Sequence, residues 1–191
     1  MSPTVTAAPR EIHDLAYRAS CVAGCEAAMA ERIAHNVTFA EIHHGGAVRT
    51  FCEALEAPAL AASEWVAAPD ALAAAELAAR SDGVASVTFE PVVPLAAIAW
   101  SLQQSLERGV TSTGAGADAR GDTTVSAIEL RLIDDAAASA RRAQTTDVRD
   151  DAYRYGVAVD QIWFSRLEAA AATYLVAEST LDEIDLRRGV T

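Results

Sequence analysis

Alanine supplies much of the apolar content of this chain, and this feature constrains the fold more than any other. Hydrophobic residues make up 51% of the 191 residues, whereas aromatic residues make up only 6%. Small side chains let neighbouring helices approach closely, but each contact then buries little apolar area. We therefore expect several tightly spaced helices, and a homo-oligomer or a partner subunit that adds buried surface.

Apolar residues recur at helical spacing over much of the chain. This spacing predicts helices over six ranges: 9–22, 25–43, 48–55, 69–80, 95–107 and 160–174. Three segments have the β-branched or alternating pattern of strands: 84–89, 110–113 and 123–133. The predicted fold class is α+β, a helix-dominated single domain over residues 9–191 with a small sheet of about three strands.

Three segments lack a strong pattern of either kind. Residues 1–8 are predicted to form a flexible N-terminal arm, because Pro9 favours the first position of the following helix. Residues 134–156 are polar and are predicted to be partly helical or mobile. Near the C-terminus, Ser179 is predicted to cap a final turn.

The charge balance excludes several classes of partner and mechanism. A net charge of -12 opposes binding to nucleic-acid phosphates and to anionic membranes, so we expect neither partner. All 15 basic residues are arginine. This excludes a Schiff-base lysine, a P-loop lysine and a Ser-Lys dyad. Codon bias in a GC-rich bacterial genome is the simplest explanation for the missing lysine.

The sequence predicts a cytoplasmic location. The first residues show no basic region followed by an apolar stretch, as a secretory signal would. The apolar runs are too short for a membrane span. Three cysteines cannot all pair with one another, which suits a reducing compartment.

Every histidine and every cysteine lies within the first 52 residues. These side chains carry most nucleophilic, proton-transfer and metal-binding chemistry. If the protein has a reactive centre of this kind, its main group comes from the N-terminal helices.

The segment His43-His44-Gly45-Gly46 is the first candidate site. Two imidazoles at a glycine-rich bend could meet a ligand closely. Arg49 follows one turn into the next helix and could bind a carboxylate, while a histidine transfers a proton. The same residues also suit a plain helix end, where the macrodipole favours histidine and glycine adopts the left-handed cap.

A second candidate is a metal site at Cys21 and Cys25. Residues four apart share a helix face, and His35, His44 and Cys52 are near in sequence. The usual C-x2-C spacing is absent, and buried cysteine often serves as a small apolar residue. Glu31 and His35 also lie one turn apart, but the sequence lacks the His-Glu-x-x-His pattern of a zinc helix. We therefore assign no metal ligands from the sequence.

Two family resemblances bear on these segments. The stretch from Ala40 to Phe51 resembles the N-terminal signature of the malate/L-lactate dehydrogenase family that lacks a Rossmann fold. In that signature an Ala-Asp pair precedes Ser-His-Gly, and an arginine and an aromatic residue follow. Here His44 matches the histidine and Arg49 the arginine, although His43 replaces the serine and Arg49 stands one residue further along. The resemblance would cover about residues 10–115 and implies NAD(P)-dependent chemistry on a 2-hydroxy acid.

The second resemblance covers more of the chain. Paired helices over residues 11–40 and an alanine-rich helix leading to Thr173-Tyr174 and Glu178-Ser179 are similar to an uncharacterised bacterial family of about this length. That family implies no particular activity.

Three functional hypotheses follow from the sequence. The first is a cytoplasmic accessory or assembly-forming protein without chemistry of its own. The second is a small enzyme that acts on a 2-hydroxy or 2-keto acid with His44 as acid or base, helped by His43 and Arg49. The third is a metal-binding module at Cys21 and Cys25.

Overall fold

The structure, a computed structural model, describes residues 3–57, 59–116 and 118–174. Helices dominate this part of the chain, and two small antiparallel sheets of two and three strands accompany them. The expected α+β, helix-dominated fold is therefore confirmed. Within the described ranges, no helix is both long and apolar enough to cross a membrane. The turn predicted at Ser179 lies outside the described residues.

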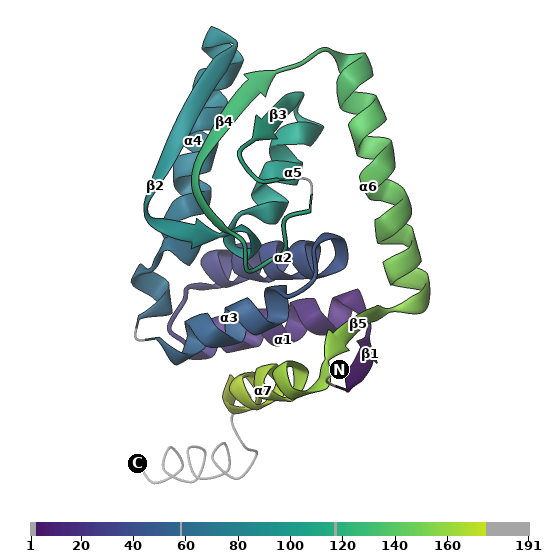
Figure 1. Cartoon of the computed structure of the whole chain (residues 1–191). Helices are drawn as coiled ribbons and strands as arrows, with labels where there is room; N and C mark the ends of the chain where they lie inside the picture. Colours follow the sequence, from purple (N-terminus) through teal and green to yellow (C-terminus); the bar gives the residue numbers. More distant parts are fainter. Residues whose placement is uncertain (1–2, 58, 117, 175–191) are drawn as a thin grey trace, which may run out of the picture.

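Four helices form one half of the molecule (Figure 1). They are α1 (Pro9–Val22), α2 (Ala27–His43), α3 (Ala47–Glu56) and α7 (Gln161–Ala171). Their contacts use fully buried alanines, among them Ala16, Ala30 and Ala34. Larger side chains such as Ile33 and Phe51 fill the space between the helices. The small residues thus let α2 lie close to its neighbours, as the alanine content predicts.

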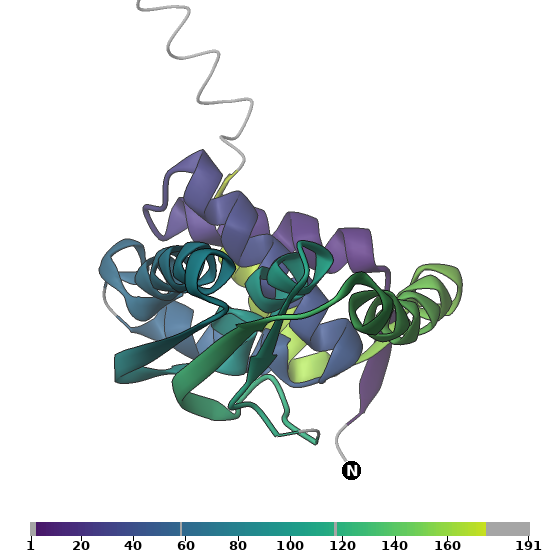
Figure 2. The ribbon, with the colours of Figure 1, turned by 90° about the horizontal axis from the view of Figure 1, so that it is seen from above.

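A three-stranded sheet occupies the other half. Its strand order is β2-β4-β3, and both pairings are antiparallel. The strands are β2 (Val84–Pro94), β4 (Thr124–Leu132) and β3 (Val110–Thr113). Two helices lie on the same side of this sheet (Figure 2): α4 (Glu64–Asp82) and α5 (Ala99–Glu107). Ile128 and Leu130 of β4 are buried, so the sheet and its helices share the core.

A long helix connects the two halves along one side of the molecule (Figure 1). This helix, α6 (Asp135–Tyr155), is capped by Asp134, whose carboxylate accepts a hydrogen bond of 2.8 Å from Ala137 N. It leads into β5 (Val157–Asp160), which pairs antiparallel with β1 (Thr4–Ala7). Gly156 lies between α6 and β5. Its φ is +82°, and a Cβ at this position would lie 2.5 Å from Thr6 Cγ2. Glycine is therefore needed for the close approach of β1.

The structure differs from the sequence predictions in several places. Most of residues 134–156, predicted to be partly helical or mobile, form α6, and β5 was not predicted. Residues 4–7 form β1, where a flexible arm was predicted. The helix predicted to open at Pro69 begins at Glu64, because Ser63 Oγ accepts a hydrogen bond of 3.3 Å from Trp65 N and caps it. The helix predicted over 95–107 is divided into a 3-10 turn (Leu95–Ala97) and α5.

Candidate functional site

The bend between α2 and α3 is built by local hydrogen bonds. His44 N donates to Ala40 O at 2.8 Å, which completes the last turn of α2. Gly46 then takes φ +77°, a conformation that favours glycine. The buried Glu41 carboxylate accepts hydrogen bonds from Gly46 N at 3.3 Å and Val48 N at 2.8 Å. The bend is thus a fixed structure that holds the two histidines in place.

Burial of Glu41 has an electrostatic consequence. Desolvation raises the pKa of this carboxyl above its usual value, while its backbone hydrogen bonds act in the opposite direction. Arg120 also lies against the bend, since a Cβ on Gly46 would come within 3.1 Å of its guanidinium. Glu41 therefore caps the start of α3 through Gly46 N and Val48 N.

His43 and His44 both line a cavity of about 560 Å³. The cavity is bounded by α2, α5, β3 and α6, so it lies where the two halves of the molecule meet. Its polar lining also includes Gln103, Thr111 and Arg141, and its apolar lining includes Phe39. A cavity of this size that combines apolar walls with a few polar groups is typical of small-molecule sites.

His43 presents an unpaired nitrogen in this region. Its Nε2 is buried and has no hydrogen-bond partner among the described residues. The ring packs against Phe39, with centroids 4.1 Å apart. Burial, followed by the nearby His44 and Arg149, lowers the pKa of His43 to about 4. The imidazole is therefore neutral at pH 7, and one nitrogen can accept a proton or a hydrogen bond.

His44 is held by a backbone contact. Its Nδ1 lies 3.0 Å from Ala119 O. Because a carbonyl oxygen can only accept, Nδ1 carries the proton and Nε2 has the free electron pair in the neutral ring. Burial lowers the pKa of His44, although the bond to Ala119 acts against this. Both imidazoles at the bend are thus set up as neutral groups.

Arg141 supplies the positive charge of the site. It is the only charged side chain among the described residues that line the larger cavity. Its Nη1 donates to Thr111 Oγ1, and no described carboxylate forms an ion pair with it. Arg142 and Arg149 line a smaller cavity of about 140 Å³, which shares His43 and Phe39 with the larger one. The two cavities that His43 lines thus contain three arginines and one carboxylate, Glu107, in a chain with a net charge of -12.

The structure does not bring Arg49 to the histidines' cavity. Arg49 lies on α3, where its Nε donates to Glu53 Oε1 at 2.9 Å and its guanidinium lies 5.5 Å from the centre of the Trp163 ring. It lines a separate cavity of about 350 Å³ with Gly46 and Arg120. Of the three predicted site residues, His43 and His44 line one cavity and Arg49 lines another. The arginine in the cavity of the two histidines is Arg141.

Arg141 was not among the site residues predicted from the sequence. The signal available was helical spacing, because Arg141 and Thr145 are four residues apart and both face the cavity. However, nothing in the polar segment 134–156 indicates that it packs near the bend, since that contact joins residues about a hundred positions apart.

The cysteines lie away from this cavity. Cys25 is buried, and desolvation raises its pKa, with the neighbouring Cys21 adding to the effect. Among the described residues, neither belongs to a group of three side chains placed to hold a metal ion. Cys52 is also buried, and burial raises its pKa to about 12. Such thiols are poor nucleophiles at neutral pH.

Comparison with known proteins gives no further guidance. No protein-family model, no curated protein and no solved structure matches this chain.

Proposed function

We propose that the protein binds a small carboxylate-bearing molecule in the cavity lined by His43, His44 and Arg141. The observation that carries this proposal is the charge of the lining. Arg141 is the only charged group there, and it has no described acidic partner. A guanidinium binds a carboxylate through two parallel hydrogen bonds. The ligand thus supplies the counter-charge that the protein lacks at this place.

The two imidazoles favour a ligand that also has a hydroxyl or keto group. His44 donates from Nδ1 to Ala119 O, which leaves its Nε2 as an acceptor. His43 has a buried nitrogen without a partner. A hydroxyl beside the carboxylate can donate a hydrogen bond to one of these nitrogens, because a neutral imidazole has one acceptor nitrogen. The 2-hydroxy acids combine these groups within a few atoms, so they are the class we propose.

Isothermal titration calorimetry of the full chain with lactate, glycolate and malate tests this proposal. We expect saturable binding of at least one acid, and Arg141→Ala should weaken it at least about tenfold. A hydrogen bond to a charged group contributes about 1.5–3 kcal/mol, which is about tenfold or more in Kd. Arg49→Ala is the matched control, because it removes an arginine from a different cavity.

Two further measurements sharpen this test. Lactamide has the shape of lactate without its negative charge, so it should bind at least about tenfold more weakly. Each acid that binds should also raise the melting temperature, because a ligand that binds only the folded state stabilises it. Equal binding by wild type and Arg141→Ala, or no binding at millimolar concentrations, would overturn the proposal.

A further inference from the structure

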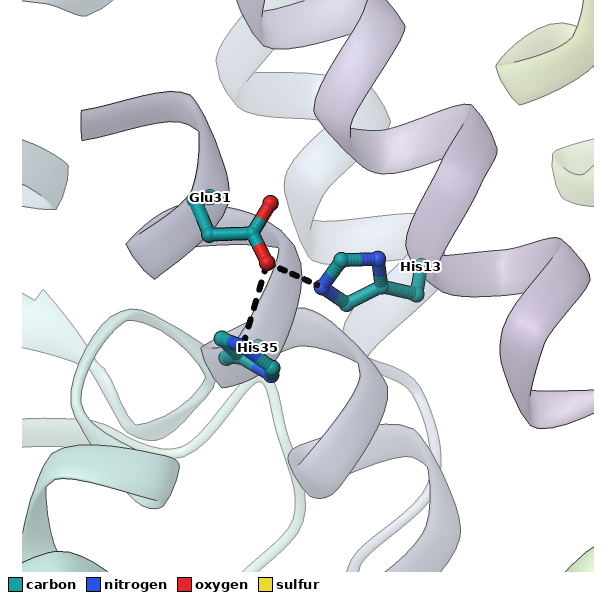
Figure 3. Close-up of side chains that lie close together, drawn as sticks. All are labelled: His13, Glu31 and His35. Atoms are coloured by element: carbon teal, nitrogen blue, oxygen red, sulfur yellow. Dashed lines mark ion pairs between the residues drawn. The ribbon is translucent and has the colours of Figure 1, made fainter. Parts of the chain in front are cut away.

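A second group of side chains lies outside the cavity of His43 and His44. His13 of α1 faces Glu31 and His35 of α2, as Figure 3 shows. Glu31 Oε1 lies 3.5 Å from His13 Nε2 and 3.3 Å from His35 Nε2. One ligand atom from each of the three side chains lies within 4.8 Å of the others. Two imidazoles and a carboxylate therefore converge on one point between two helices.

Hydrogen bonding does not account well for these distances. A hydrogen bond between a nitrogen and an oxygen usually spans about 2.7–3.2 Å. Both contacts to Glu31 are longer, and both imidazoles approach the same carboxylate oxygen. His13 Nε2 is buried, yet it has no hydrogen-bond partner among the described residues. A buried polar atom without a partner is unfavourable, so this nitrogen calls for another explanation.

The spacing fits a shared metal ion. Nitrogen and oxygen ligands lie about 2.0–2.1 Å from zinc, so two ligands of a tetrahedral site are about 3.4 Å apart. The two contacts to Glu31, at 3.3 and 3.5 Å, fall on either side of this value, and all three ligand atoms lie within 4.8 Å of one another. An octahedral site at the same bond length would place adjacent ligands about 3.0 Å apart, which is shorter than both.

The ring of Trp100 orients His35, and Glu31 remains accessible to solvent. The His35 ring stacks on Trp100, with centroids 5.6 Å apart and planes inclined by 27°. Packing of this kind fixes the direction of a ligand side chain. Glu31 is half exposed and His35 is 45% exposed, so an ion can reach these two side chains from solvent. Glu31 and His35 also line a cavity of about 290 Å³ together with Arg32 and Arg108.

We propose that His13, Glu31 and His35 bind one zinc ion, with the fourth position open to water. Zinc accepts both imidazole nitrogen and carboxylate oxygen, and three protein ligands with one open position are typical of its reactive sites. The open position borders the 290 Å³ cavity, because two of the three ligands line it. This site is separate from the proposed carboxylate site, and neither proposal depends on the other.

Titration of the chelator-treated full chain with Zn²⁺ alone tests this proposal by calorimetry. We expect one ion per chain. His13→Ala and His35→Ala should each weaken binding at least about 100-fold, because loss of an outer partner already weakens metal sites about 10–100-fold. Glu31→Gln keeps the size of an exposed side chain and serves as the third variant, should a histidine variant fail to fold. Cys21→Ser and His44→Gln are matched controls, because they remove other possible zinc ligands.

Cobalt supplies a second readout. Substitution of Co²⁺ should give the visible absorption of a four-coordinate ion in wild type and in both control variants, but not in Glu31→Gln. Failure of wild type to bind Zn²⁺ would overturn the proposal. Binding that survives in Glu31→Gln, or that is lost in Cys21→Ser, would also overturn it, because the ligands would then be elsewhere.

Discussion

Glu76 is one of two deeply buried carboxylates in the described part of the chain, and it is well paired. Its oxygens accept hydrogen bonds from Arg108 Nε at 2.6 Å, Arg108 Nη2 at 2.5 Å and Ser105 Oγ at 2.8 Å. These contacts join α4 to α5. The hydrogen bonds from Arg108 lower the pKa of Glu76, although burial opposes this. The ion pair thus fixes how the two helices sit on the sheet.

Removal of this carboxylate should destabilise the protein. Glu76→Ala leaves Arg108 and Ser105 without their shared acceptor, so the free energy of unfolding should fall by about 2–4 kcal/mol. Chemical denaturation measures this change. Asp14→Ala breaks the more exposed Asp14–Arg18 pair on α1 and is the control, with an expected loss below about 1 kcal/mol. Equal effects of the two substitutions would contradict this role for Glu76.

The buried imidazole of His43 should make stability depend on pH. Its pKa is about 4 in the folded protein, against an ordinary value of 6.5. Between these two values the unfolded chain binds the proton and the folded protein does not. The free energy of unfolding should therefore fall as the pH is lowered from 6.5 towards 4. Denaturation of wild type and His43→Gln at several pH values should show a smaller fall in the variant. Parallel curves would show that His43 is not the group responsible.

Among the elements, β1 is a strand in a segment that was predicted to be a flexible arm. Its four residues close the two-stranded sheet with β5, and Gln161 N donates to Pro3 O at 3.0 Å beside it. Deletion of residues 1–7 should therefore lower the free energy of unfolding by at least about 2 kcal/mol, because each backbone hydrogen bond contributes about 0.5–1.5 kcal/mol. Deletion of residues 1–2 alone is the control. A full deletion with no effect on the denaturation curve would mean that β1 does not hold β5.

The elements that the sequence predicts well are those with a strong internal pattern. α2 buries Ile33 and Val37 at helical spacing, and β3 has the bounds that were predicted. The elements that it missed depend on partners far along the chain. β1 has only four residues, too few for its alternating pattern to predict a strand, and its partner β5 lies far along the chain.

The same reasoning applies to the candidate sites. His43 and His44 are adjacent in the sequence, so their place at a helix end could be predicted. Arg141 reaches their cavity only through the packing of α6, and His13 reaches Glu31 only through the packing of α1 on α2. Contacts between helices depend on which faces meet, and one sequence alone does not specify this.

For the whole molecule, self-association stays a prediction of the sequence. Alanine-rich helices bury little area each, and α6 leaves Val148, Tyr153 and Tyr155 at least 45% exposed. Its buried side chains among the described residues are Ala138 and Ala152. We therefore expect light scattering after size-exclusion chromatography to give the mass of a dimer or a larger assembly, and Tyr153→Glu to reduce it. A monomer at every concentration tested would contradict this prediction.

The proposed binding of a 2-hydroxy acid in the cavity at the α2–α3 bend is tested most directly by NMR of the histidines. The chain has four histidines, so the ¹⁵N spectrum of their side chains is simple enough to follow each one. Titration of metal-free, ¹⁵N-histidine-labelled protein with a 2-hydroxy acid should shift the imidazole signals of His43 and His44 and leave those of His13 and His35 in place. Shifts confined to His13 and His35, or no shift at saturating acid, would contradict the account.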